Sequence, residues 1–285
     1  MAGGAILFAL MNFFARLASS SASWTTVGGV RALIGALVAI GVARARGTSL
    51  VANDRKAVLW RSLFGTAAMG TTFYALSSRT LPLGDTVTLL NLTPVFLAVL
   101  APFVLREQTS AAVGVALVLS LGGVVLIVHP SFNWQGATSS SGPSAGTTAA
   151  VAVAAAFFAS IAMMMLRRVG KTETPEAIAV HFSLFAAIVM LGLSLFDLRL
   201  PTLRDAGFMV AGGVCAGFGQ LALTRAYTLE RAARVSGMGY LAVVASALLG
   251  AAVLGERPSL GAVSGMALVV MGGLVVTFIR DAKEE

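Results

Sequence analysis

The chain has 285 residues, of which 57% are hydrophobic and only 11% are charged. A soluble domain usually carries about 25% charged residues, so this composition excludes a soluble enzyme with a membrane anchor and favours a chain embedded in lipid. The formal net charge of +8 would fit nucleic-acid binding in a soluble protein. Here the basic residues lie between apolar runs and form no arginine-rich arm, so we expect no nucleic-acid partner.

Ten apolar segments are long enough to cross a bilayer, which takes about 20 helical residues. They are 2–18, 25–43, 58–78, 84–104, 110–129, 147–166, 175–196, 206–226, 232–254 and 259–280. Between the fifth and sixth segments lies an uncharged stretch rich in Ser, Gly and Pro, which is typical of a linker outside the membrane. We therefore predict an all-α integral membrane protein with ten transmembrane helices, divided into 1–129, a linker at 130–148, and 149–285.

The two halves repeat the same landmarks in the same order. A turn containing Glu107 follows the fourth span, and a turn containing Glu256 follows the ninth. The next span then contains Gly122-Gly123 in the first half and Gly272-Gly273 in the second. Because each half has five spans, the second copy must enter the membrane in the opposite direction. The sequence thus predicts a five-plus-five inverted-topology repeat.

Basic residues favour one side of the predicted membrane. With a cytoplasmic N-terminus, fourteen basic residues, among them Arg61, fall on the cytoplasmic side. Five fall on the other side, namely Arg16, Arg79, Arg199, Arg204 and Arg257. Since cytoplasmic loops are enriched in Lys and Arg, we expect both termini in the cytoplasm.

These landmarks resemble the drug/metabolite transporter superfamily in its EamA-type branch, and among its members the YddG-like amino-acid exporters. The resemblance is carried by Leu89-Leu90-Asn91-Leu92-Thr93-Pro94, Glu107 and Gly122-Gly123, and by the echo from Tyr240 through Glu256 to Gly272-Gly273. It departs at Val243, which stands where the first half has Pro94. The resemblance implies a bacterial inner-membrane exporter of amino acids, other metabolites or drugs.

Polar side chains near the middle of a span are the best pointers to a binding site, because they cost free energy unless they face a partner or a wet cavity. Seven residues from both halves meet this criterion and are our candidates for substrate binding: Asn12, Arg31, Tyr74, Asn91, His181, Gln220 and Tyr240. A site near the midplane between the repeats would draw on both halves in this way.

Each candidate also has a purely structural interpretation. The amides of Asn12, Asn91 and Gln220 could be hydrogen-bond glue between helices, and Arg31 could extend to the interface. His181 could carry a proton or rest neutral with a hydrogen bond. Interfacial anchoring is the alternative for the tyrosines, and it is stronger for Tyr227 than for Tyr240 because Tyr227 lies near a helix end.

Three further residues could bend the helices during a conformational cycle. Pro94 removes a backbone donor from the fourth span, and Gly237 and Gly239 loosen the start of the ninth. Static packing would explain all three positions equally well.

The sequence contains few features that would indicate an enzyme or a cofactor-binding protein. No HExxH motif and no phosphate-binding loop occur, and the twelve acidic residues fall in loops or at span ends. We therefore expect no enzyme activity, no catalytic residue, no metal and no cofactor. An intramembrane carboxylate for proton coupling is not evident, which leaves facilitated diffusion or exchange at least as plausible as active transport.

The sequence as a whole predicts an exporter of small amphipathic metabolites, first of all aromatic or hydrophobic amino acids, working by alternating access. Its expected partners are the small-molecule substrate and the lipid bilayer, and we expect a monomer. The alternatives are an exporter of drugs or other metabolites, or a membrane scaffold subunit without transport activity.

Overall fold

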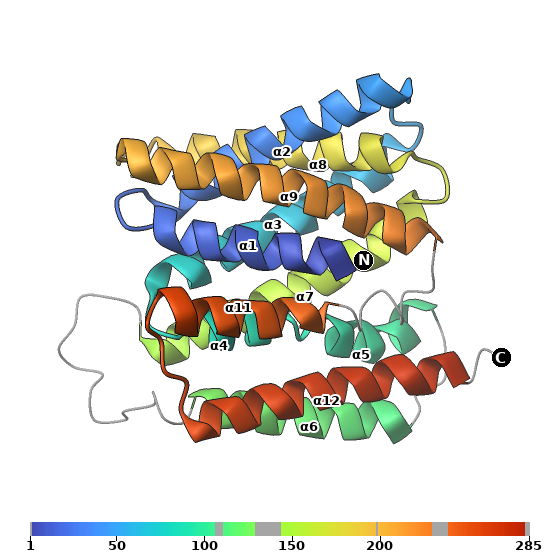
Figure 1. Ribbon diagram of the computed structural model, residues 1–285. Helices are drawn as coiled ribbons and strands as arrows, with labels where there is room; N and C mark the ends of the chain where they lie inside the picture. The colour runs from blue at the N-terminus through green and yellow to red at the C-terminus, as the bar shows by residue number, and fades with distance from the viewer. Residues whose placement is uncertain (1, 106–110, 129–143, 198, 230–238, 283–285) are drawn as a thin grey trace.

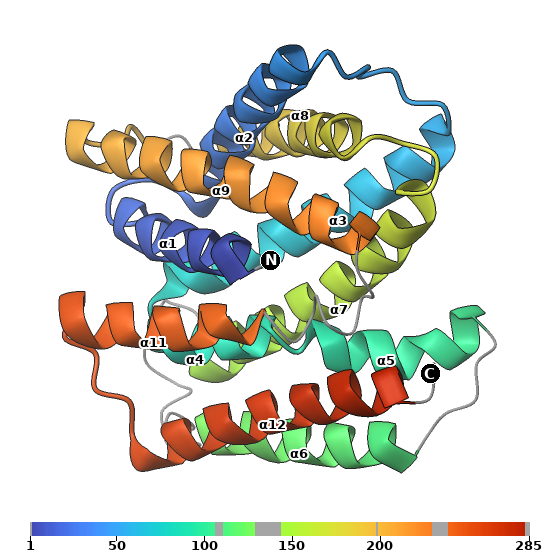
Figure 2. The same ribbon diagram turned by 45° about the vertical axis from the view of Figure 1, so that its right-hand side comes forward.

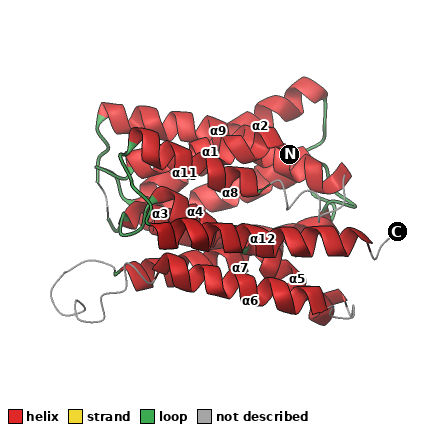
Figure 3. Cartoon of the chain, turned by 60° about the horizontal axis from the view of Figure 1, so that its bottom comes forward, coloured by secondary structure: helices red, strands yellow, loops and turns green. Residues whose placement is uncertain are grey.

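The computed structural model describes residues 2–105, 111–128, 144–197, 199–229 and 239–282. Every regular element in these ranges is an α-helix (Figure 3). The helices are α1 (Ala2–Ala18), α2 (Trp24–Arg46), α3 (Arg55–Ser78), α4 (Leu83–Leu90), α5 (Thr93–Leu105), α6 (Ala111–Val128), α7 (Ala145–Val169), α8 (Pro175–Ser194), α9 (Leu203–Leu229), α11 (Tyr240–Val253) and α12 (Leu260–Ala282). Since α4 and α5 are two parts of one span, the prediction of an all-α membrane protein with ten transmembrane helices is confirmed.

Length and hydropathy single out four of the described helices as able to cross a membrane, namely α2, α7, α8 and α9. Five shorter apolar stretches, in α1, α4–α5, α6, α11 and α12, accompany them. Helix α3 has 24 residues but belongs to neither set, because polar and basic side chains lower its hydropathy. This polarity suits a helix that faces a cavity within the protein.

Side-chain caps begin several helices and keep the connecting loops short. Ser23, Asp54, Ser144 and Thr174 each accept a hydrogen bond from a backbone N–H in the first turn of the helix that follows. Such caps satisfy donors that the helix itself cannot pair. At the other end of α2, Gly47 adopts the left-handed conformation with φ of 64°, which a glycine tolerates at no steric cost.

The packing of the helices is symmetric between the two halves. Helix α1 packs on α9 as α3 packs on α7, and α1 contacts α11 as α4 and α5 contact α7. Equivalent helices also pair with each other, α2 with α8 and α6 with α12. Figures 1 and 2 show α6 and α12 side by side at one edge of the bundle, away from α2 and α8. This pattern is what a repeat of two five-span halves requires.

Equivalent helices run in opposite directions, which makes the repeat an inverted one. The last residue of α2, Arg46, forms an ion pair of 2.8 Å with Glu176 in the first turn of α8, so the end of one helix lies beside the start of the other.

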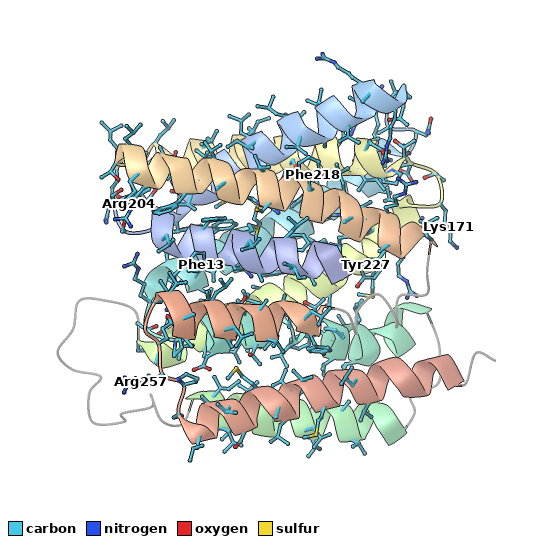
Figure 4. The ribbon with its side chains drawn as sticks, in the orientation of Figure 1. Phe13, Lys171, Arg204, Phe218, Tyr227 and Arg257 are labelled. Atoms are coloured by element: carbon cyan, nitrogen blue, oxygen red, sulfur yellow. The ribbon has the colours of Figure 1, made fainter. Side chains whose placement is uncertain are left out.

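The two ends of the bundle are marked in Figure 4 by labelled residues. We call them the Lys171 end, where α1 begins and α2 and α9 finish, and the Arg257 end, where α1 finishes and α2 and α9 begin.

The fourth span is broken in its middle rather than bent. Helix α4 ends at Leu90, and α5 begins at Thr93. Pro94 thus lies in the first turn of a new helix, where its missing N–H would have no partner in any case. The helix is thus interrupted at Asn91 and Leu92, just before Pro94.

The start of the ninth span also differs from the prediction. In the described residues α11 begins at Tyr240, and Gly239 precedes it as the cap residue. Gly239 is therefore outside the helix that it was expected to loosen, while Gly237 lies outside the described residues.

Candidate functional site

A cavity of about 260 Å³ lies between the two halves. Its described walls come from α1, α2, α3 and the α4–α5 break in the first half, and from α7, α8, α9 and the start of α11 in the second. Helices α6 and α12 contribute none of the described lining residues. Both halves thus supply equivalent helices to one central space, as expected for a site at a repeat interface.

Four of the seven predicted binding residues line this cavity: Asn12, Arg31, Asn91 and Gln220. The amides of Asn91 and Gln220 make hydrogen bonds within their own helices, to Val87 O at 2.8 Å and to Thr224 Oγ1 at 3.3 Å. These contacts do not join helices, so the interpretation of these two amides as interhelical glue is not supported. Pro94 and Gly239 also line the cavity, which places the break in the fourth span in its wall.

Arg31 does not extend to the membrane interface. Its side chain is buried, and Nη1 lies 3.1 Å from Sδ of Met69 on α3. Nε is buried without a hydrogen-bond partner. The guanidinium therefore lies inside the protein, against the wall of the cavity.

The other three predicted residues lie outside the described lining. The Tyr74 ring packs edge-on against Trp24, with the ring centroids 5.8 Å apart. His181 Nδ1 lies 2.8 Å from Ala177 O in the same helix, which agrees with the interpretation of a resting histidine. Tyr240 is buried against α12, where its hydroxyl occupies the space beside Gly273.

Among the residues of the cavity wall that the sequence did not single out are Arg61, Phe182 and Tyr227. Arg61 was counted as a cytoplasmic loop charge, yet it is only 2% exposed and its Cζ lies 4.3 Å from the centroid of the Phe182 ring. Its position inside the predicted span 58–78 was the available signal. Tyr227 was expected to anchor at the interface, whereas it lines the cavity; Tyr240, an expected binding residue, does not.

The cavity lies toward the Lys171 end of the bundle. Its lining includes Phe8 near the start of α1 and Tyr227 near the finish of α9, and Figure 4 shows Tyr227 at that end. The lining residue nearest the Arg257 end on α1 is Asn12. The space beyond Asn12 is filled by packed side chains and a polar network.

That network fastens α1 to the loop between α11 and α12. Arg16, which is 5% exposed, forms an ion pair of 3.0 Å with Glu256 and also donates to Leu81 O. The second carboxylate oxygen of Glu256 accepts a hydrogen bond of 2.7 Å from the N–H of Leu83 at the start of α4. Arg16 is therefore not a loop charge facing water, and Glu256 accepts from the first N–H of α4.

The opposite end is held by a different set of carboxylates. Glu173, between α7 and α8, accepts hydrogen bonds of 2.8 Å from the N–H groups of Asn53 and Asp54 before α3. The Arg46–Glu176 pair lies beside it. Loops from both halves are thus joined at the Lys171 end as well, by residues that are not among the described lining residues of the cavity.

Comparison with known proteins identifies the family. Residues 1–129 and 147–278 each match the EamA-like transporter family. The pseudopaline exporter CntI of Pseudomonas aeruginosa is 27% identical over 271 residues, which cover 95% of this chain and 92% of that protein. Human solute carrier family 35 member G1 is 27% identical over 237 residues, covering 80% of this chain and 63% of that protein.

A solved crystal structure has the same fold. It superposes with a TM-score of 0.69 and covers 99% of both chains at 20% sequence identity. The identity is too low to carry function, so the likeness concerns the fold alone. Together with the two matched halves, these findings make the chain a member of the EamA-like transporter family.

Proposed function

We propose that this protein exports small amphipathic metabolites across a bacterial inner membrane, with aromatic and hydrophobic amino acids as the first class to test. The observation that carries this proposal is the central cavity, which both repeats line and which combines aromatic walls with three amides and two buried arginines. Small-molecule sites are typically concave and apolar, with a few polar groups that fix orientation. The family and its relatives are transporters, so an enzyme activity has no support here.

Alternating access is the mechanism that this geometry favours. The cavity extends toward the Lys171 end, while the Arg16–Glu256 pair joins helices at the Arg257 end. Breaking that pair and closing the Lys171 end would turn the same cavity toward the other side. Bistable packing of two repeats around a fixed site is the common way to achieve this exchange.

The distribution of basic residues supports cytoplasmic termini. Exposed arginines such as Arg44, Arg46 and Arg55 lie at the Lys171 end, and Lys and Arg favour the cytoplasmic side. Arg16 and Arg61 drop out of this comparison because both are buried. With this orientation, a cavity toward the Lys171 end would accept cargo from the cytoplasm.

Counterflow into liposomes tests the proposal. Purified protein is reconstituted with unlabelled phenylalanine or leucine inside, and uptake of the labelled amino acid is followed without an imposed ion gradient. We expect transient accumulation above protein-free liposomes. A flat trace for every amino acid would refute the amino-acid class.

A pair of matched variants ties the activity to the cavity. Ala159→Phe places a ring in the lining of α7, whereas Ala150→Phe adds the same ring to an exposed position on the same helix. We expect A159F to abolish counterflow and A150F to preserve it. Equal activities of the two variants would show that transport uses another path.

A further inference from the structure

Two arginines from neighbouring helices face the same cavity. Arg31 of α2 is 6% exposed and Arg61 of α3 is 2% exposed, and both line the central space. The helices that carry them, α2 and α3, also contact each other. The cavity therefore concentrates positive charge at one part of its wall.

These charges lack the partners that buried arginines normally have. Nε of Arg31 and both Nε and Nη1 of Arg61 are buried without a hydrogen-bond acceptor. None of the described lining residues is an Asp or Glu, and the ion pairs of the described residues involve neither arginine. A buried charge without a counterion is costly, and an anion in the cavity would reduce that cost.

The local packing holds Arg61 toward the cavity. Its guanidinium lies over the Phe182 ring and along α3 beside Gly65. A Cβ atom at position 65 would collide with the guanidinium and lie 2.8 Å from Cε2 of Phe182. The absence of a side chain at Gly65 is thus what leaves room for the charged group.

We infer that this cavity selects organic acids with two carboxylates on a partly apolar skeleton. Each guanidinium presents a planar fork that matches a carboxylate with two parallel hydrogen bonds, so two arginines suit two carboxylates. The inference rests on the proposed function only in taking the same cavity as the cargo site. It shifts the preferred cargo from neutral amino acids to dianions.

Two further features fit a dianionic organic acid. Helix α5 begins at the cavity wall, where Thr93 and Pro94 line the space, and the start of a helix carries a partial positive charge. Phe8, Met11 and Phe73 supply apolar walls nearby. An inorganic anion such as phosphate would gain nothing from these walls, whereas a carbon skeleton would bury apolar surface against them.

Binding to the purified protein in detergent provides the test. The probe is 2-benzylsuccinate, a dicarboxylate with an aromatic group, and its affinity is compared with those of 3-phenylpropionate, phenylalanine and inorganic phosphate by titration calorimetry. We expect the dicarboxylate to bind at least about tenfold more tightly than the other three, because each charged hydrogen bond adds affinity. Equal or tighter binding of phosphate or of phenylalanine would overturn the inference.

Arginine variants locate the binding. Arg31→Gln and Arg61→Gln are each expected to weaken binding of 2-benzylsuccinate about 10- to 100-fold. Arg55→Gln changes an exposed arginine on the same helix as Arg61 and should leave the affinity unchanged. Arg61→Lys keeps the charge without the fork, and its intermediate affinity would show that geometry as well as charge matters.

These experiments distinguish a failure of the dicarboxylate inference from a failure of the proposed amino-acid transport. Size-exclusion profiles and melting temperatures first establish that each variant is folded, and Arg31→Lys replaces R31Q if the latter is not. Counterflow of phenylalanine together with absent binding of 2-benzylsuccinate would overturn the dianion and keep the amino-acid transporter. Tight, arginine-dependent binding of the dicarboxylate without counterflow of any amino acid would overturn the amino-acid class and keep the dicarboxylate inference.

Discussion

Arg16 and Glu256 lie 240 positions apart in the sequence and form an ion pair of 3.0 Å at the Arg257 end of the bundle. The first residue belongs to the first span of the first repeat, and the second lies between the last two spans of the second repeat. This pair is an ion pair that joins the two halves on the side away from the cavity. In an alternating-access cycle it must break each time the cavity turns outward.

Glu256→Gln is expected to favour the outward-open state. Glu256 is partly exposed, but Arg16 is buried; leaving a buried charge without its partner costs about 2 kcal/mol or more, and 2 kcal/mol changes a two-state ratio roughly thirtyfold. Cysteines that carry spin labels are introduced at Arg199 and Arg257, both exposed at this end, in a Cys215→Ala background. Pulsed electron paramagnetic resonance should then give a longer distance between the labels in E256Q than in the parent.

A control for this experiment uses another carboxylate at the same end. Asp197 forms an exposed pair of 3.0 Å with Arg199, and exposed pairs contribute little, about 0–1 kcal/mol. With the label moved from Arg199 to Leu200, Asp197→Asn should leave the distances unchanged. Identical distributions for E256Q and the parent would contradict a gating role for Glu256.

The architecture of the chain could be predicted because it depends on long-range hydropathy. Apolar runs of about 20 residues define spans in lipid, and the landmarks at Glu107 and Glu256 repeat at a fixed offset. The ten spans and their inverted arrangement followed from these features alone. The break between α4 and α5 did not, because Asn91 and Leu92 are as compatible with a continuous helix as with its interruption.

The site could be predicted only in part, for a physical reason. Mid-span polarity identified Asn12, Arg31, Asn91 and Gln220, since a polar group deep in a span needs a cavity or a partner. Arg61 was missed because its distance from the predicted span end fits a loop charge equally well. Which side of a helix faces inward depends on packing angles that the sequence does not contain.

Gly65→Ala is expected to weaken cargo binding without touching either arginine. Its new methyl group would displace the Arg61 guanidinium and the Phe182 ring, which lies 2.8 Å from the added atom. Gly70→Ala is the matched control on α3, because its Cβ would find Met190 and Trp24 at ordinary distances of 3.6 and 3.7 Å. Titration of both variants with 2-benzylsuccinate should show a loss of affinity in G65A alone.

The contact between α6 and α12 leads to a prediction about stability. A Cβ atom on Gly123 would lie 2.6 Å from the carbonyl oxygen of Gly265, and the reverse substitution gives the same distance. Since both neighbours are backbone, Gly123→Ala must push the helices apart, at a cost of about 1–3 kcal/mol. Gly114→Ala, with no atom within 4 Å of the new methyl group, should be neutral or mildly stabilising.

Thermal denaturation in detergent, followed by size exclusion, compares these two variants. A clear drop in the melting temperature of G123A, with no drop for G114A, is the expected outcome. Equal melting temperatures would mean that the two helices can separate at no cost, and the close backbone approach would then have no role in stability.

His181 is expected to be dispensable for transport. Its imidazole Nδ1 lies 2.8 Å from the carbonyl oxygen of Ala177 one turn earlier, and the ring is not part of the described cavity lining. A proton carrier must exchange protons with the transport path as the cycle proceeds, which this position does not offer. His181→Gln should therefore keep counterflow rates within about twofold of the parent at pH 6 and pH 8, because changes away from a site rarely exceed about 0.5 kcal/mol.

The control for this variant is Asn91→Leu, which removes an amide from the cavity wall and should reduce the same rates at both values of pH. A pH-dependent rate in the parent that becomes flat in H181Q would instead make His181 the coupling residue.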